Sequence, residues 1–334
     1  MLLSLVIPIY NEAAAFPLLL PELRKVLGGI GCDHEILLIN DGSSDGSLEQ
    51  ITAAAREDSR IKVLSFARNF GHQAAITAGI DFTSGDAVVV MDADLQDPPE
   101  LLTEMVARYR EGYDVVSAQR VTRAGDSLFK KTTARFFYWV MRTMVDERIV
   151  PEVGDFRLFS RDAVMAIRGF REQHRFMRGL VAWLGLKEAI IPFHRATRSA
   201  GETKYPLHKM LRFAYSAIAS FSALPLRIAT ALGLLLCFAG FLYLAYTLYI
   251  ALVLQIAIPG WTSIVVLQCI FSGMTLLCLG LIGDYVARIF DESKQRPLYV
   301  LSKTVNIRVA DFATHRAVVL PHCEEPTHFH AKMS

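Results

Sequence analysis

The stretch that decides the fold is an apolar run ending in acidic residues: Val88-Val-Val-Met-Asp92-Ala-Asp94-Leu-Gln96-Asp97-Pro98-Pro99. Unbroken Val/Ile/Leu runs are typical of strands buried in a parallel sheet, and ligands of such sheets bind beyond the carboxyl ends of the strands. Asp92 and Asp94, with the amide oxygen of Gln96, suit a hard divalent cation that also contacts substrate phosphates. The stretch therefore predicts a site for a metal and a nucleotide diphosphate. The alternative is that these residues only solvate a strand end.

Apolar runs and amphipathic stretches alternate through the N-terminal part of the chain. This alternation favours βαβ units and a mostly parallel α/β sheet. Polar residues follow two further predicted strands, in Pro8-Ile-Tyr10-Asn11-Glu12 and in Asn40-Asp41, so we expect them at the same sheet edge. The predicted strands are Leu3–Ile9, Glu35–Asn40, Ile61–Phe66, Ala87–Met91 and Val115–Ala118, and the predicted helices are Ala14–Val26, Ser47–Arg56, His72–Ile80 and Pro99–Arg110.

A long charge-free run follows this part of the chain. No Asp, Glu, Lys or Arg occurs from Ile228 to Gly283, and Pro259-Gly260 interrupts the run near its middle. At about 20 residues per crossing, the run is long enough for two membrane helices and a tight turn. Lys and Arg flank both ends of the run and are absent from the turn, so the positive-inside rule places both ends in the cytoplasm. A buried core helix is the alternative, although it does not easily account for so long a run.

Two further stretches, 128–145 and 205–227, combine apolar residues with Lys and Arg at helical spacing. Such helices lie in the headgroup layer of a membrane. For 128–145 an ordinary core-facing helix is an equal alternative. The formal net charge of +2 gives no indication of nucleic acid, and the five cysteines form no CxxC pair. Isolated cysteines of this kind fit a reducing cytoplasm.

Seven short motifs occur in order along the chain, and together they resemble the motif set of family 2 glycosyltransferases. The resemblance is to the subgroup that acts on polyprenyl phosphates, which includes dolichyl-phosphate mannosyltransferase and the GtrB-type and ArnC-type enzymes. It extends from about Leu3 to Val300, whereas the His-rich tail matches nothing recognisable. The motifs are Val6–Glu12, Asn40–Asp45, Ala67–Gly71, Met91–Pro99, Gly154–Leu158, Arg175–Gly179 and Gly201–Tyr205.

The resemblance implies a GT-A fold, a Rossmann-like α/β domain whose nucleotide-sugar site opens onto a bilayer. The implied organisation is a cytoplasmic glycosyltransferase domain at 1–204, an interfacial region at 205–227, a two-helix transmembrane hairpin at 228–283 and a cytoplasmic segment at 284–334. The sheet is expected to be complete before the hairpin. The resemblance also implies an enzyme of the inner membrane and a homo-tetramer.

The resemblance and the charges of the substrates assign roles to the polar residues. Asp155 stands where the family has its proposed catalytic base, and the alternative is a structural carboxylate paired with Arg157. A phosphate acceptor is largely dianionic at neutral pH, so it needs cations more than a base. The predicted metal ligands are Asp92, Asp94 and Gln96; the nucleotide-sugar residues are Pro8, Tyr10, Glu12, Asp41, Asp92 and Arg198; the acceptor-phosphate residues are Arg120, Arg123, Arg175, Arg178 and Lys204; and the catalytic residues are Asp94 and Asp155.

The implied reaction is inverting transfer of a monosaccharide from a nucleotide sugar to undecaprenyl or another polyprenyl phosphate, with Mg²⁺ or Mn²⁺ as cofactor. The product would serve glycan modification of the cell envelope, such as lipopolysaccharide. UDP-glucose is the first choice of donor, and GDP-mannose, a UDP-aminoarabinose derivative and a UDP-N-acetylhexosamine remain alternatives. A membrane-tethered, lipid-binding scaffold is the non-enzymatic alternative. A processive synthase is disfavoured because two spans cannot enclose a polymer channel and because a Gln-x-x-Arg-Trp motif is absent.

Overall fold

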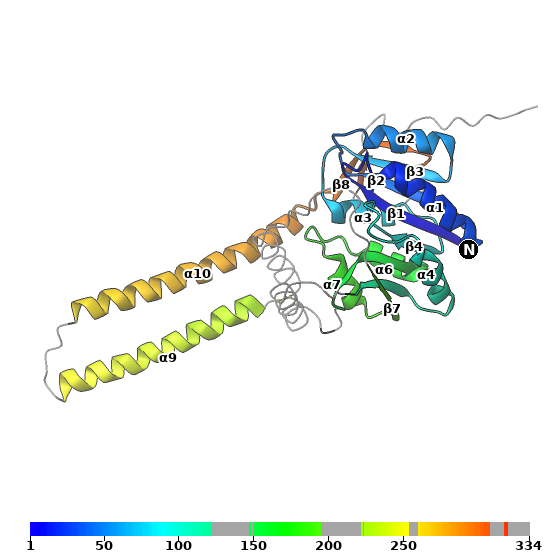
Figure 1. Ribbon diagram of the computed structural model, residues 1–334. Helices are drawn as coiled ribbons and strands as arrows, with labels where there is room; N and C mark the ends of the chain where they lie inside the picture. Colours follow the sequence, from blue (N-terminus) through cyan, green and yellow to red (C-terminus); the bar gives the residue numbers. More distant parts are fainter. Residues whose placement is uncertain are drawn as a thin grey trace, which may run out of the picture. The chain divides into compact units, whose positions relative to one another are not determined.

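The computed structural model describes residues 1–121, 147, 150–194, 222, 224–253, 260–307 and 317–319. The chain separates into two compact units (Figure 1). The first unit is Met1–Leu211 with Arg296–Ser334, and the second is Arg212–Gln295. The first unit holds the sheet and its helices, and the second holds the two long helices.

A mixed sheet forms the centre of the first unit (Figure 1). In the described residues it has nine strands in the order β7-β5-β6-β4-β1-β2-β3-β8-β9. The four N-terminal strands run parallel, whereas β6 is antiparallel to β4 and β5, and β8 is antiparallel to β3. The strands are β1 (Leu2–Ile9), β2 (Asp33–Asn40), β3 (Ile61–Phe66), β4 (Ala87–Val90), β5 (Val115–Arg120), β6 (Val153–Ser160), β7 (Glu188–Phe193), β8 (Tyr299–Val305) and β9 (Ala317–Val319).

Helices cover both faces of the sheet. Side chains alternate between the faces along a strand: in β1, Leu5 and Ile7 enter one hydrophobic cluster, and Val6 enters the other. Burial on both sides explains why these strands are continuously apolar. The first cluster packs against α1 (Phe16–Ile30), α2 (Ser47–Glu57) and α4 (Leu101–Arg110), and the second packs against α3 (His72–Asp81), α6 (Arg161–Gly169) and α7 (Met177–Leu184).

The predicted α/β fold is confirmed, and all strands and helices predicted up to Ala118 are present with small shifts of their ends. The largest shift is in α1, which continues past Val26 to Ile30 and ends at Gly31, whose φ of 69° is in the left-handed region. That conformation favours glycine and terminates the helix.

One expectation is wrong: the sheet is not complete before the hairpin. Strand β8 follows the long helices in the chain and pairs antiparallel with β3. Its first residue, Tyr299, is buried, stacks on Phe66 with 5.2 Å between ring centroids, and donates from its hydroxyl to Asp81 Oδ2 at 2.7 Å. Arg171 donates to both oxygens of the same carboxylate, at 2.7 and 2.8 Å. Part of the predicted separate segment 284–334 is therefore integral to the first unit.

Truncation after Tyr205 is consequently expected to prevent cooperative folding, because it removes β8 and exposes Phe66. In the full chain, Tyr299→Phe removes only the hydroxyl and should cost about 1–3 kcal/mol of stability, since buried Asp81 loses a donor. Thermal unfolding in detergent measures the effect. Tyr113→Phe is the control, because the Tyr113 hydroxyl makes no hydrogen bond within the described residues. A truncated chain that melts cooperatively would contradict the role given to β8.

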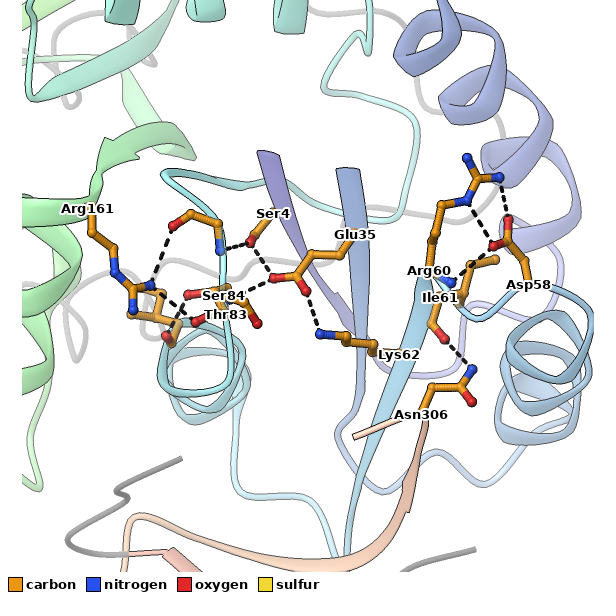
Figure 2. A network of polar contacts seen from close by, with 12 residues as sticks. Ser4, Glu35, Asp58, Arg60, Ile61, Lys62, Thr83, Ser84, Arg161 and Asn306 are labelled. Carbon is orange, nitrogen blue, oxygen red and sulfur yellow. Dashed lines mark hydrogen bonds and ion pairs between the residues drawn. The ribbon is translucent and has the colours of Figure 1, made fainter. Parts of the chain in front are cut away.

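A buried polar network joins the amino-terminal ends of the central strands (Figure 2). Asp92 and Asp94 follow the opposite, carboxyl-terminal end of β4. Glu35 at the start of β2 accepts from Ser4 Oγ at 2.5 Å, from Ser84 N at 2.7 Å and from Lys62 Nζ at 2.5 Å. Nearby, Asn306 Nδ2 donates to Ile61 O at 2.8 Å, which ties the chain after β8 to β3. The network satisfies polar groups that would otherwise be costly to bury.

This network predicts a pH-dependent contribution to stability. Burial alone would raise the pKa of Glu35, but the hydrogen bonds from Lys62, Ser4 and Ser84 outweigh burial and lower it. A lowered folded-state pKa stabilises the protein above the unfolded value of about 4.3, and this contribution is lost as the pH falls through the folded-state value. Glu35→Gln should therefore destabilise the chain by about 1–3 kcal/mol at neutral pH and by less in acid. Thermal melts over a pH series test this, and a pH-independent difference would contradict it.

The second unit contains α9 (Leu224–Leu252) and α10 (Trp261–Ser293), drawn in yellow and orange in Figure 1. Both are long and apolar enough to cross a membrane, with candidate spans at Leu224–Thr247 and Val266–Ser293. Neither span has buried side chains among those described. The helices extend beyond the predicted 228–283 at both ends. The predicted interfacial stretch 128–145 and most of 205–227 lie outside the described residues.

Candidate active site at the carboxyl ends of the strands

Three loops meet at the carboxyl ends of the parallel strands. The register pairs Ile9 with Asn40 and Val6 with Val90, so β1, β2 and β4 end close to one another. The residues that follow, Tyr10–Glu12, Asp41 and Asp92–Asp97, are those predicted to gather at this edge. The topology thus confirms their common location, which is where ligands bind in open α/β sheets.

The first loop is held in one shape by hydrogen bonds to the loop after β2. Asn11 has a φ of 56°, a left-handed conformation that Asn tolerates. Its Oδ1 accepts from Ser44 N at 2.9 Å, while Glu12 N donates to Ser47 Oγ at 2.9 Å. Pro8 is buried in β1, whereas the Tyr10 side chain is half exposed and available to a ligand.

Asp41 is buried, and backbone donors surround its carboxylate. Its Oδ1 accepts from Phe70 N at 2.7 Å and its Oδ2 accepts from Gly71 N at 3.0 Å, which fixes the entry into α3. Burial raises the pKa of Asp41 despite these hydrogen bonds. In the structure Asp41 therefore stabilises the loop before α3, and its contact with a nucleotide sugar stays a prediction.

The loop Asp92–Asp97 after β4, here called the acidic loop, is stabilised by hydrogen bonds between its own residues. Buried Asp97 accepts from Asp92 N at 3.2 Å, and Asp94 Oδ1 accepts from Gln96 N at 3.1 Å. Leu95 between them has a φ of 59°, so the chain turns back on itself. Burial, with the nearby charge of Asp92, raises the pKa of Asp97 to about 7. Burial and the charges of Asp155 and Asp94 also raise the pKa of Asp92, against the effect of His72.

The donor set in this loop fits a divalent cation that shares its ligands with a substrate. No three His, Cys, Asp or Glu side chains of the described part converge into a closed metal cluster. Asp92 and Asp94 are nevertheless near enough for the charge of one to disfavour the charge of the other, and a cation would relieve this repulsion. Mg²⁺ typically takes one or two carboxylates and completes its shell with phosphate oxygens and water. Asp92, Asp94 and Gln96 are the residues that would hold it.

A second charged cluster surrounds Asp155 on β6. His72 Nε2 lies 3.3 Å from Asp155 Oδ2 and 3.5 Å from Asp92 Oδ1. Gln73 Nε2 donates to the same Asp155 oxygen at 3.3 Å, and Arg178 Nε lies 3.6 Å from the other oxygen. Asp155 thus has closer partners than Arg157, which acts on it only through its charge.

These contacts shift two pKa values in opposite directions. Burial would raise the pKa of Asp155, but the hydrogen bond from His72 and the charges of Arg178 and His72 hold it well below its ordinary value. For His72, burial lowers the pKa, while the hydrogen bond to Asp155 and the charge of Asp92 raise it and prevail. The cluster therefore favours an ionised carboxylate beside cationic partners.

Arg120, at the end of β5, lies near enough to the acidic loop for its charge to affect two carboxylates there. Its positive charge favours the ionised forms of Asp92 and Asp97, and a Cβ at Gly154 would lie 3.4 Å from its Nη2. Its Nε is buried and has no hydrogen-bond partner within the described residues. This unused donor makes Arg120 a candidate to contact an anion bound near the acidic loop.

The structure does not bring every predicted residue into this cluster. Arg175 donates from Nη2 to Ile167 O at 3.2 Å, and its charged neighbours are Asp81 and Arg171 near the end of α3. Burial lowers the pKa of Arg175 to about 10. Its contact with an acceptor phosphate stays a prediction without support from these contacts. Arg123, Arg198 and Lys204 lie outside the described residues.

Two residues of the cluster, His72 and Gln73, were not among the site residues predicted from the sequence. They directly follow the motif Ala67–Gly71 and begin α3, whose first turn reaches the same sheet edge as the acidic loop. Their position in the sequence could have indicated this. A helix that starts at the carboxyl end of a parallel strand presents its first polar side chains to the edge of the sheet where ligands bind.

Comparison with known proteins identifies the enzyme class to which this chain belongs, the glycosyltransferases. The model of glycosyl transferase family 2 matches residues 4–168. The chain belongs to glycosyltransferase family 2.

Relatives match over nearly the whole chain. The uncharacterized glycosyltransferase YkcC of Bacillus subtilis is 45% identical over 91% of this chain and 94% of its own length. The bactoprenol glucosyl transferase of Shigella phage SfV is 38% identical over 90% of this chain and 98% of its own length. The prophage bactoprenol glucosyl transferase homolog of Escherichia coli is 37% identical over 91% of this chain and 99% of its own length.

Proposed function

We propose that this protein transfers a monosaccharide from a nucleotide sugar to the phosphate of a polyprenyl lipid, with glucose from UDP-glucose as the first choice. The observation that carries the proposal is the pair of adjoining clusters: an acidic one at Asp92 and Asp94 and a cation-flanked one at Asp155. Relatives named as bactoprenol glucosyl transferases and two helices apolar enough to span a membrane support a lipid acceptor.

At the donor end, the displaced nucleoside diphosphate gains negative charge as its bond to the anomeric carbon breaks. A bound Mg²⁺ or Mn²⁺ would neutralise this charge. Asp92 and Asp94 would hold the cation, and the hydrogen bonds of Asp97 and Gln96 keep their loop in place before the substrate arrives. Arg120 adds a positive charge beside the same loop.

At the acceptor end, an oxygen of the lipid phosphate attacks the anomeric carbon from the face opposite the leaving group, which inverts the configuration. The phosphate is largely dianionic at neutral pH, so the attack requires no proton acceptor. A carboxylate with a pKa held well below its ordinary value is also a poor base. Asp155 is therefore proposed to orient its cationic neighbours, Arg178 and His72, toward the phosphate.

We place the protein in the cytoplasmic membrane, with the first unit and both ends of the chain on the cytoplasmic side. The charge-free run and the cations that flank it support this orientation.

A donor panel tests the proposal. The purified full chain is incubated with undecaprenyl phosphate, Mg²⁺ or Mn²⁺ and one of several nucleotide sugars, and glycolipid is detected by mass spectrometry. We expect a hexosyl-phosphate lipid from UDP-glucose. A product from GDP-mannose or a UDP-N-acetylhexosamine would correct the sugar and keep the reaction class, whereas no glycolipid from any donor would contradict the proposal.

A further inference from the structure

Gln73 occupies an unusual position at the start of α3, because both ends of its amide are used by other elements. Its Nε2 donates to Asp155 Oδ2 on β6 at 3.3 Å, and its Oε1 accepts from Met177 N, the first residue of α7, at 3.2 Å. A single half-buried side chain thus links α3, β6 and α7.

The contact with Met177 fulfils a need of α7. The first backbone N–H groups of a helix have no partner within the helix and are usually satisfied by a capping side chain. The N-cap residue of α7, Phe176, makes no side-chain cap hydrogen bond. Gln73 supplies an acceptor from another helix instead, so it fixes the first turn of α7 in space.

The same turn carries Arg178. Asp155 therefore has its Oδ2 held by Gln73 and His72, while its Oδ1 faces Arg178 on a helix whose start Gln73 also holds. One amide group thus contacts both the carboxylate and the helical turn that carries its cationic partner.

We propose that Gln73 is a positioning residue for glycosyl transfer, which sets Asp155 and Arg178 in the geometry that receives the acceptor phosphate. This inference rests on the proposed function. An amide is required because it donates to a carboxylate at one end and accepts from a backbone N–H at the other. Glutamate would place a like charge against Asp155, and leucine would keep the shape but lose both hydrogen bonds.

The test compares Gln73→Leu and Gln73→Glu in the full chain with Gln50→Leu as the matched control. Gln50 lies on α2, and its buried Oε1 has no hydrogen-bond partner in the part of the chain that the structure describes. Four quantities are measured on each preparation: UDP affinity, turnover and KM with undecaprenyl phosphate, melting temperature, and hydrogen exchange of the peptide that contains the start of α7.

For Gln73→Leu we expect transfer to fall by about 10²-fold, because a small misplacement of catalytic groups has an effect of this size. UDP affinity should stay within about twofold, since the donor contacts are on other loops. Exchange at the start of α7 should rise about tenfold with the loss of one hydrogen bond. Gln73→Glu should be the slower of the two variants, and Gln50→Leu should behave as the wild type.

Wild-type transfer by Gln73→Leu would overturn the proposal, and so would parallel losses of transfer, UDP affinity and melting temperature, which indicate a purely structural role. A wild-type chain that does not glycosylate undecaprenyl phosphate would instead contradict the proposed function. In that case hydrogen exchange still tests the role of Gln73. Faster exchange in Gln73→Leu would show that Gln73 stabilises the start of α7, and unchanged exchange would contradict this.

Discussion

Asp94→Asn is expected to reduce glycosyl transfer by about 10²–10³-fold, the usual cost of removing one group that stabilises charge in the transition state. The substitution removes a charged ligand from the cation that would neutralise the departing diphosphate. It keeps the side-chain oxygen that accepts from Gln96 N, so the loop should retain its shape. Turnover is measured over a titration of Mg²⁺ or Mn²⁺, beside the melting temperature.

The matched control is Asp86→Asn, an acid-to-amide change next to the other end of β4. Asp86 accepts from Leu2 N at 2.8 Å and lies at the edge of the sheet opposite the site. It should leave transfer near the wild-type rate. Wild-type turnover by Asp94→Asn at limiting metal would show that Asp94 is not a metal ligand.

Asp155→Asn is expected to slow transfer by about 10²-fold or more while UDP affinity stays within about twofold. The neutral amide no longer attracts Arg178 and His72, so the cations lose their common partner at the acceptor side. Three quantities measured on one preparation separate the explanations: UDP affinity, transfer rate and melting temperature. A combined fall of melting temperature and UDP affinity would indicate a structural carboxylate, and normal transfer would remove Asp155 from the site.

The pH dependence sharpens this second prediction. If Asp155 accepted a proton, its substitution would remove a group from the acidic limb of the pH–rate profile. The pKa of Asp155 is held well below its ordinary value, so Asp155 is not expected to be the group that produces the acidic limb. We therefore expect Asp155→Asn to lower the rate at every pH and to keep an acidic limb, which moves only because the pKa values of Asp92 and His72 fall when the charge of Asp155 is lost.

The parallel strands and the acidic loop could be predicted because their signals are local. A strand such as Ala87–Val90, buried on both faces, must be apolar throughout, and the acids after it must lie at its carboxyl end. Strand β6 gives a weaker signal, because it contains Asp155 and the buried Arg157 within its apolar residues. Its polar residues belong to the site and mask the pattern of a buried strand.

Long-range pairings escaped prediction for a different reason. Strand β8 pairs with β3 although two long helices lie between them in the chain. A pattern within a short stretch of sequence cannot indicate such a pairing. Likewise, His72 and Gln73 begin a helix whose remaining residues are mostly buried, and their role becomes visible only when β6 and α7 bring Asp155 and Met177 beside them. Tertiary packing, not local preference, creates that cluster.

The helix α3 connects these two features of the molecule. His72 and Gln73 at its first turn contact the Asp155 cluster, and Asp81 at its last turn binds Tyr299 of β8 and Arg171. The strand that returns from the long helices thus holds the far end of the helix that presents the site. We therefore expect the position of the site to depend on β8.

The most direct test of the proposed transfer to a lipid phosphate is to identify the bond that forms. The full chain is given undecaprenyl phosphate and UDP-glucose labelled with ¹³C at the anomeric carbon, and the lipid product is examined by NMR. We expect the labelled carbon to couple to the lipid phosphorus and to have the β configuration, inverted from the α configuration of the donor. Labelled glucose that is free, retained as the α anomer, or bonded to an acceptor other than phosphate would contradict it.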